Sequence, residues 1–560
     1  MQEHIQSLIS QALDSLVADK TLTEADASRI TIERTRDPAH GDFATNIALV
    51  LAKQAGVNPR QLATAIIAAI PEDRDIDAIE IAGPGFINFF LSKQSLSSTL
   101  HSILSAGDTF GHHDMGRGES VQVEFVSANP TGPLHVGHGR GAAVGDSICR
   151  LLSAGGYTVQ REFYYNDAGA QIDHLARSVQ ARCLGLTPDD PSWPEDGYRG
   201  DYIRDVAESF MNKAMIEAED RQVAANGDVN DIAAIREFAV AYLRREQDHD
   251  LTAFRVRFDH YFLESSLYQS GAVDAVVDRL IASGHTYEEA EALWLRTETF
   301  GDDKNRVMRK SEGGYTYFVP DVAYHLNKWQ RGFSTVINEQ GADHHSTITR
   351  VRAGLQALDV GIPEGWPEYV LHQMVLVMRN GEEVKLSKRA GSYVTLRDLV
   401  EEVGCDATRY FLVARAPTSQ LTFDIDLALS RTNENPVYYI QYAHARICAM
   451  LRKLERSYTT EELLAPEILA ALDQPQEYAL LKELDKFPAL MQQACTQRSP
   501  HLIANYLKEL AATFHTFYNA HRVLVDDEVV MKARIALCLG TRQVIKNGLD
   551  ILGVSAPESM

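Results

Sequence analysis

The feature that most constrains the fold is a strand, a turn and a helix that follow one another from residue 121. Val121–Val126 alternate as an apolar strand, Asn129–Pro133 form a turn rich in Pro and Gly, and a helix of small residues continues to Leu152. This order is typical of the first unit of a nucleotide-binding α/β domain. Gly137 and Gly139 would let a ligand approach the backbone, and the helix start would offer free N–H groups and a positive dipole end to phosphate.

The length of the chain predicts several domains, because 560 residues exceed what one hydrophobic core usually supports. We expect a multidomain α/β protein in three parts. Residues 1–110 are predicted to form a small α+β domain, residues 111–430 a Rossmann-type domain, and residues 431–560 an all-α bundle. A charged, mostly helical stretch at about 170–300 is expected to be an insertion in the second domain.

Composition argues against several classes of protein. The formal charge of −23 disfavours a protein that coats DNA or RNA nonspecifically, although acidic and basic residues are nearly balanced beyond residue 436. No run of about 18 apolar residues and no secretory signal pattern occur, so we expect a cytoplasmic protein without membrane contacts. The six cysteines are scattered and no histidines have ligand spacing, so we expect no structural metal.

Two basic motifs carry the predicted chemistry. His135 and His138 stand at the start of the small-residue helix, where two imidazoles can donate to an oxyanion. About 250 residues later, Lys385, Ser387 and Lys388 lie in a short segment ending in glycine, which can neutralise a polyphosphate as it leaves. Alone, the first is compatible with a simple helix start and the second with a solvated turn. Together and in this order, they favour nucleotide chemistry.

These motifs resemble those of class I aminoacyl-tRNA synthetases, with His135-Val-Gly-His138 at the HIGH signature and 385–389 at the KMSKS signature. Leu386 and Arg389 depart from the second pattern, whereas Lys388 is kept. A closer resemblance, nearly end to end, is to the arginyl-tRNA synthetases of the bacterial type. It is carried by residues 40–46, 83–88, 123–138, 165–172, 341–345 and 439–446.

The resemblance implies a reaction in two steps. The carboxylate of L-arginine attacks the α-phosphate of ATP and releases pyrophosphate, and the arginyl group then passes to the 3′ end of tRNA(Arg). Mg²⁺ would come with the nucleotide, and no protein nucleophile is needed. The family also leads us to expect a monomer whose arginine activation requires bound tRNA.

The resemblance also implies the residues of the site. Catalytic roles fall to His135, His138, Lys385 and Lys388. ATP binding falls to Gly137, Gly139, Asp343, His344 and Ser387. Arginine binding falls to Glu124, Asn129, Tyr317, Asp321 and Gln340. Binding of tRNA falls to Tyr439, Gln441, Tyr442, Arg446 and Arg452 in the C-terminal bundle, which would bind the anticodon, while the N-terminal domain would contact the tRNA D-loop.

Residue chemistry supports the choice of amino acid. A guanidinium is a planar fork of donors that needs carboxylates to accept them. Glu124 is a lone acid in an apolar strand and therefore needs a partner, whereas Asp321 would also suit a helix N-cap. The bundle tyrosines offer rings for stacking on bases, although a core position is the commoner place for any one of them.

Other functions remain open at this stage. A small nucleotidylyltransferase shares the H-x-G-H loop, but such chains are short and lack a long helical appendage. A catalytically inactive relative that only binds RNA is disfavoured by the intact His135, His138 and Lys388. Among class I synthetases, the cysteinyl, glutamyl and lysyl types are the nearest alternatives, and Glu124 with Asp321 separates them from the arginyl type.

Overall fold

The computed structural model describes residues 1–24, 26–35, 37–218, 221–384 and 393–560. The chain divides into two compact units. The first comprises residues 1–110, 450–486 and 512–544, and the second comprises residues 111–449, 487–511 and 545–560. No helix in the described ranges is both long enough and apolar enough to cross a membrane.

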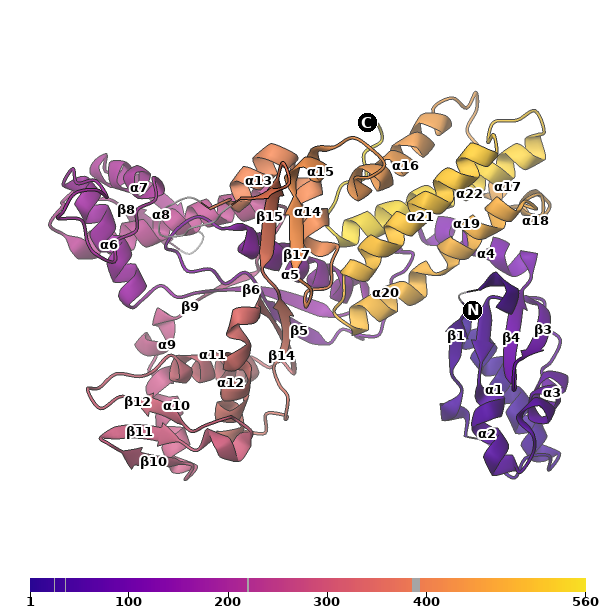
Figure 1. The fold of residues 1–560 in the computed structure, drawn as a ribbon, viewed down its shortest axis with the longest axis horizontal. Coiled ribbons are helices and arrows are strands. Elements are labelled where there is room, and N and C mark those ends of the chain that lie inside the picture. Colours follow the sequence, from indigo (N-terminus) through magenta and orange to yellow (C-terminus); the bar gives the residue numbers. More distant parts are fainter. Residues whose placement is uncertain (25, 36, 219–220, 385–392) are drawn as a thin grey trace. The chain divides into compact units, whose positions relative to one another are not determined.

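The first unit begins with an antiparallel sheet and its helices (Figure 1). The sheet has the order β1-β2-β4-β3. Its elements are α1 (Gln2–Ala18), β1 (Ile32–Arg34), β2 (Phe43–Thr45), α2 (Ile47–Ala55), α3 (Pro59–Ala69), β3 (Ile76–Ala82), β4 (Phe86–Leu91) and α4 (Lys93–Ala106). The apolar residues of α1 recur at helical spacing from Ile5 to Leu16 and are buried.

The second unit is built on a parallel sheet with the order β14-β13-β5-β6-β9. Its strands are β5 (Ser120–Glu124), β6 (Thr158–Tyr165), β9 (His260–Leu263), β13 (Thr335–Gly341) and β14 (Glu368–His372). The chain runs outward from β5 to β6 and β9, and then continues on the other side of β5 with β13 and β14. The strand order therefore reverses beside β5, and ligands of such sheets bind at the carboxyl ends of the strands at this point.

Helices and three smaller sheets surround the parallel sheet. The helices are α5 (Val136–Ala154), α6 (Ala170–Cys183), α7 (Tyr202–Met211), α8 (Ile232–Ala253), α9 (Ser265–Gln269), α10 (Ala272–Ala282), α11 (Phe318–Gln330), α12 (His345–Ala357), α13 (Leu396–Val403), α14 (Cys405–Val413) and α15 (Ile425–Leu429). The remaining strands are β7 (Met215–Ala218), β8 (Arg221–Ala224), β10 (Thr286–Glu289), β11 (Ala292–Leu295), β12 (Arg306–Arg309), β15 (Val375–Arg379), β16 (Glu382–Glu383) and β17 (Leu421–Asp424).

The stretch at about 170–300 is more than a helical insertion. The helices α6, α7 and α8 share a buried apolar core there. The same stretch also supplies β9, which pairs in parallel with β6 at the edge of the central sheet. The sequence did not reveal this strand because His260–Leu263 is short and alternates little.

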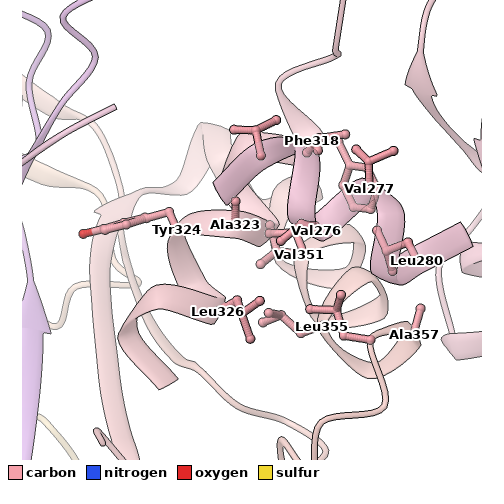
Figure 2. Close-up of a cluster of buried hydrophobic side chains, with 14 of the residues drawn as sticks. Val276, Val277, Leu280, Phe318, Ala323, Tyr324, Leu326, Val351, Leu355 and Ala357 are labelled. Atoms are coloured by element: carbon pink, nitrogen blue, oxygen red, sulfur yellow. The ribbon is translucent and has the colours of Figure 1, made fainter. Parts of the chain in front are cut away.

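One apolar cluster packs α11 against α10 and α12. Figure 2 shows Val276 and Val277 of α10, Phe318 and Ala323 of α11, and Val351 of α12 in the same cluster. Because interiors are close-packed, this cluster fixes the rotation of α11 about its axis. The opposite face of α11, with its polar side chains, is thereby held toward the sheet.

Beyond residue 435 the described chain is helical, as predicted. Its helices are α16 (Pro436–Leu451), α17 (Thr460–Leu464), α18 (Pro466–Leu469), α19 (Pro475–Asp485), α20 (Phe487–Thr496), α21 (His501–Ala520) and α22 (Glu528–Ile551). In the first unit, α19 is joined to the N-terminal sheet, where Lys482 Nζ lies 2.7 Å from Asp42 Oδ1.

Candidate active site

The signature loop ends in a histidine cap at the start of α5. His135 Nδ1 accepts hydrogen bonds from the backbone N–H groups of Gly137 (3.1 Å) and His138 (3.3 Å). In return, His138 Nδ1 accepts from the N–H of His135 at 3.2 Å. The two rings stack with their centroids 3.6 Å apart. The first turn of α5 therefore holds both imidazoles in a fixed orientation.

This cap determines which ring nitrogen carries the proton. A neutral imidazole has one donor and one acceptor nitrogen, so an Nδ1 that accepts from backbone leaves Nε2 as the N–H donor. The expectation of free backbone N–H groups at this helix start is wrong. Those of Gly137 and His138 are bonded to His135, and that of Val136 donates to the carbonyl of Val394 at 3.3 Å. Donation to an anion must come from Nε2 of the rings.

The two glycines of the motif differ in their surroundings. A Cβ on Gly137 would lie 2.9 Å from Cε1 of His135, so a side chain there would displace the ring. Gly139 is buried, and a Cβ there would lie 2.9 Å from Cδ1 of Leu396. Gly139 thus allows α5 to pack closely against α13.

The chain that follows the second basic motif lies beside the signature loop. Thr395 forms a β-bridge with His135, and the N–H of Leu396 donates to the carbonyl of Leu134 at 2.8 Å. The Tyr393 hydroxyl also donates to the Pro133 carbonyl at 3.3 Å. Lys385, Ser387 and Lys388 themselves lie outside the described residues. The described chain from Tyr393 onward lies beside a loop some 250 residues earlier in the sequence.

A row of polar residues crosses the carboxyl end of the sheet. Glu124 of β5 is in register with Glu162 of β6 on one side and with Asn338 of β13 on the other. Side chains in register on parallel strands point to the same face, and here that face meets α11. The Arg331 guanidinium and the Tyr324 hydroxyl both donate to the Glu162 carboxylate. Each buried acid therefore meets a donor from the region of α11.

Both carboxylate oxygens of Glu124 have partners. Lys328 Nζ donates to Oε2 at 2.5 Å, and the Ser127 hydroxyl donates to Oε1 at 2.9 Å. Val126 and Ser127 have positive φ angles of 68° and 42°, a conformation that costs free energy in residues other than glycine. This strained turn brings the Ser127 hydroxyl back onto the end of β5. Each carboxylate oxygen still has a second lone pair for a ligand.

Asp321 is the acid that the protein leaves without a cation. It lies in the first turn of α11, and no salt bridge or hydrogen bond to its carboxylate is found among the described residues. Burial, reinforced by the negative charges of Glu264 and Glu124, raises the pKa of Asp321 to about 7, although the positive charge of Arg350 opposes this shift without forming a salt bridge. The N-cap alternative is wrong, because Tyr317 occupies that position and Asp321 lies four residues further on.

The other residues predicted to bind arginine, and two of those predicted to bind ATP, differ in their surroundings. Gln340 follows Asn338 on β13, and its side-chain nitrogen is buried with no hydrogen-bond partner in the described part of the chain. Asn129 donates to Gln171 Oε1 at 2.7 Å. Tyr317 is 75% exposed. Asp343 is exposed in the turn after β13, and the side chain of His344 lies outside the described residues.

Models of three protein families match the chain in succession. Residues 3–91 match the arginyl tRNA synthetase N terminal domain, residues 99–417 match the catalytic domain of class I tRNA synthetases (R), and residues 440–560 match the DALR anticodon binding domain. An arginine–tRNA ligase of Geotalea uraniireducens is 59% identical, with full coverage of both chains. The chain belongs to the arginyl-tRNA synthetase family. An arginine–tRNA ligase of Geobacter metallireducens is 58% identical, again over the whole of both chains.

Solved structures confirm the predicted fold class. A putative arginyl-tRNA synthetase from Campylobacter jejuni superimposes with a TM-score of 0.75 at 32% identity, covering 84% of this chain and 100% of that one. The arginyl-tRNA synthetase of Thermus thermophilus gives a TM-score of 0.77 at 23% identity over the whole of both chains, which supports the fold alone. The α/β synthetase core, the small N-terminal domain and the helical C-terminal domain are therefore shown.

The residues of this synthetase predicted to bind tRNA are divided along α16. Tyr442 is 37% exposed and stacks on Tyr438 with centroids 6.1 Å apart, and the Arg446 guanidinium lies 5.8 Å from the Tyr442 ring. Tyr439 is half-buried and Arg452 is exposed. Gln441 departs from the prediction. It is buried, and its amide donates to Asp406 and to the Ser555 carbonyl, both at 2.9 Å, so it holds the C-terminal segment instead of facing a ligand.

Two polar residues beside Asp321 and Glu124 were missed in the sequence. Glu264 follows β9 and accepts from the Tyr164 hydroxyl at 2.6 Å, and burial raises its pKa. It was missed because β9 was missed. Lys328 was not singled out in the sequence. A signal for it was present, since Asp321, Tyr324 and Lys328 recur at the helical spacing that puts them on one face.

Proposed function

We propose that the carboxyl ends of β5 and β13 hold the substrates of an arginine–tRNA ligase. The enzyme joins L-arginine to AMP at the expense of ATP, releases pyrophosphate, and transfers the arginyl group to the 3′ end of tRNA(Arg). The observation that supports this site best is Asp321, a half-buried carboxyl that forms no salt bridge in the described residues and whose pKa is raised to about 7. A guanidinium satisfies such a group because it is always charged.

In the proposed arginine pocket, the guanidinium is received by Asp321 and by the Oε1 side of Glu124. The unpaired amide nitrogen of Gln340 supports a polar ligand here, because buried donors normally have a partner. Asn129 and Tyr317 complete the assigned set at the rim. The substrate carboxylate would then point away from these acids and toward the cationic loop residues.

At the nucleotide end, His135 and His138 donate from Nε2 to the phosphates. Lys385, Lys388 and Ser387 would neutralise the departing pyrophosphate, and these three lie outside the described residues. Gly137, Gly139, Asp343 and His344 are assigned to the nucleotide. Mg²⁺ enters as part of the nucleotide substrate, since the residues assigned here are mainly imidazoles, amines and glycines, which suit phosphate better than a metal. Catalysis rests on positioning and charge stabilisation.

The assignments outside the catalytic core are also proposals. Residues 431–560 bind the anticodon, with Tyr442 and Arg446 of α16 exposing a ring and a cation, and residues 1–110 contact the D-loop. We propose a cytoplasmic monomer that contacts neither membranes nor DNA and has no structural metal. The potential ligands His4, Asp73 and Asp75 cluster within 4.8 Å in the described N-terminal part, and a direct His4–Asp73 contact of 2.9 Å accounts for two of them.

Pyrophosphate exchange tests the reaction directly. The full chain is incubated with ATP, labelled pyrophosphate and each standard amino acid in turn, with and without total tRNA. Exchange with arginine alone, and only with tRNA present, is expected. Exchange with arginine in the absence of tRNA would contradict the tRNA requirement. Absence of exchange from folded protein would favour a relative that only binds RNA.

A further inference from the structure

Lys328 is a buried cation directly behind the proposed arginine pocket. Its side chain is fully buried, and Nζ donates to Glu124 Oε2 at 2.5 Å and to Asn338 Oδ1 at 2.9 Å. The same ammonium lies 4.3 Å from the centroid of the Tyr324 ring. A buried ammonium is stable only when it is paired and hydrogen-bonded, and these contacts provide both. Lys328 is therefore held in one position.

A chain of hydrogen bonds fixes the acceptor that Lys328 uses. His325 Nδ1 lies 2.7 Å from the Asp321 carbonyl, so this nitrogen must be the donor. Nε2 of the neutral ring is then an acceptor, and Asn338 Nδ2 lies 2.7 Å from it. Burial, followed by the charge of Lys328, lowers the pKa of His325 to about 3, so the ring stays neutral. The Asn338 amide is thus oriented with its oxygen toward Lys328.

Two of the acids on this face each form a salt bridge with one cation. Arg331 pairs with Glu162 on β6, and Lys328 pairs with Glu124 on β5. Asp321 has no such partner in the described residues. A substrate cation therefore meets one acid without a salt bridge in the described residues. It also meets Glu124, whose Oε2 is held by Lys328 and whose Oε1 accepts a hydrogen bond from the Ser127 hydroxyl.

We infer that Lys328 is a positioning residue for arginine: by holding Oε2 of Glu124 it presents the Oε1 side to the guanidinium. Lys328 does not touch the substrate. It acts through Glu124, whose carboxylate would otherwise be held only at Oε1, by the Ser127 hydroxyl. This inference rests on the proposed assignment of Glu124 to the arginine pocket. Loss of the Lys328 ammonium should weaken arginine binding. It should not affect ATP binding, because the phosphate end of the site is held by separate contacts.

The first test compares Lys328→Gln with the wild-type chain in tRNA arginylation. The KM for arginine should rise about tenfold to a hundredfold, the range expected for losing a hydrogen bond to a charged group, while kcat and the KM for ATP change less than about twofold. Lys328→Arg keeps the charge and should give a smaller rise in KM. An arginine KM within about twofold of wild type for Lys328→Gln would overturn the inference, as would equal rises in the two variants.

Arg331→Gln is the matched control. It also removes a cation from a buried acid at the end of α11, but its partner is Glu162 and not Glu124. It should lower the thermal stability while leaving the arginine KM within about twofold. If Arg331→Gln raised the arginine KM as much as Lys328→Gln, the effect would be a general consequence of disturbing α11, and the inference would fail.

A double variant keeps the test decisive even if Lys328→Gln folds poorly. Glu124→Gln with Lys328→Gln removes both charges, so no unpaired ion is left buried. If Lys328 acts through Glu124, the double variant should have the same arginine KM as Glu124→Gln alone. A further rise in the double variant would contradict the inference. If Glu124→Gln itself left the arginine KM unaltered, the proposed pocket would fail independently of Lys328.

Discussion

The two ends of the active site differ in how far the protein satisfies its own polar groups. At the phosphate end, the Nδ1 atoms of His135 and His138 accept from backbone N–H groups and the rings stack. At the arginine end, Asp321 has a raised pKa and Gln340 has a buried amide nitrogen without a partner in the described chain. The histidines of the phosphate end are already oriented in the empty enzyme. At the arginine end, the ligand supplies hydrogen-bond and charge partners that the described chain does not.

The difference indicates where free energy is stored and released. Orienting the histidines in advance costs nothing when ATP binds, which favours stabilisation of charge during the reaction. A half-buried carboxyl without a salt bridge destabilises the empty enzyme and becomes favourable when a cation binds. Selection of the amino acid should therefore depend most on the arginine end.

Replacing Asp321 should have the largest effect. Asp321→Asn keeps the shape but removes the negative charge, so kcat/KM for arginine should fall about a hundredfold or more, because a truncated buried charge pair costs about 2–5 kcal/mol. The measurement is steady-state arginylation. Asp302→Asn, which disturbs the buried Asp302–Arg306 pair elsewhere, should leave the arginine KM unaltered. Retention of normal arginine kinetics by Asp321→Asn would remove the distinction between the two ends.

Replacing His138 should change the reaction rate rather than arginine binding. The Asn oxygen in His138→Asn can still accept the backbone hydrogen bond, but the distal donor is lost, so kcat should fall about a hundredfold with the arginine KM nearly unaltered. His138→Gln, whose amide can reach further, should lose less. Single-turnover adenylate formation is the appropriate measurement. A rise in the arginine KM with normal kcat would contradict the assignment of His138 to the phosphate end of the active site.

The pH dependence of arginine binding follows from Asp321. Its pKa in the empty enzyme is raised to about 7, and only the ionised form attracts the guanidinium. As pH falls through this value the carboxyl takes up a proton, so the arginine KM should rise about tenfold for each unit below about 7. The KM for ATP should vary less. A flat arginine profile between pH 5.5 and 7.5 would contradict the raised pKa.

The smallest effect is expected at Ser127. Its hydroxyl donates to Glu124 Oε1, so this carboxylate at the arginine end is also oriented before the ligand binds. Ser127→Ala should raise the arginine KM about fivefold, because one hydrogen bond contributes about 1 kcal/mol. Thermal unfolding should show little change. A loss as large as that of Asp321→Asn would mean that the turn and not the unpaired acid dominates binding.

The sequence predicted the scaffold better than the chemistry within it. The strand, glycine-rich loop and helix from residue 121 and the helical C-terminal region were predicted from local periodicity, and both are confirmed. The strand β9 was missed because four residues carry too little pattern. Glu264 at its end was missed with it, since its place beside Asp321 depends on pairing across the sheet.

The hydrogen-bond partners of the site residues could not be predicted from the sequence either. No local rule shows that His135 uses its Nδ1 to cap its own helix, or that Lys328 meets Glu124 some 200 residues earlier. For Gln441, the motif suggested a tRNA contact, whereas tertiary packing turned the side chain toward the C-terminal segment. The role of each predicted contact remains a prediction, and so do the domain limits at residues 110 and 430.

The most direct measurement is the proton change when arginine binds. Calorimetric titration of the full chain with arginine at pH 7, in buffers of different ionisation enthalpy, counts the protons released. Because the pKa of Asp321 is raised to about 7, binding should release a fraction of a proton at this pH, and more at pH 6. Binding with no proton release at either pH would contradict the conclusion that arginine completes an unpaired, partly protonated acid.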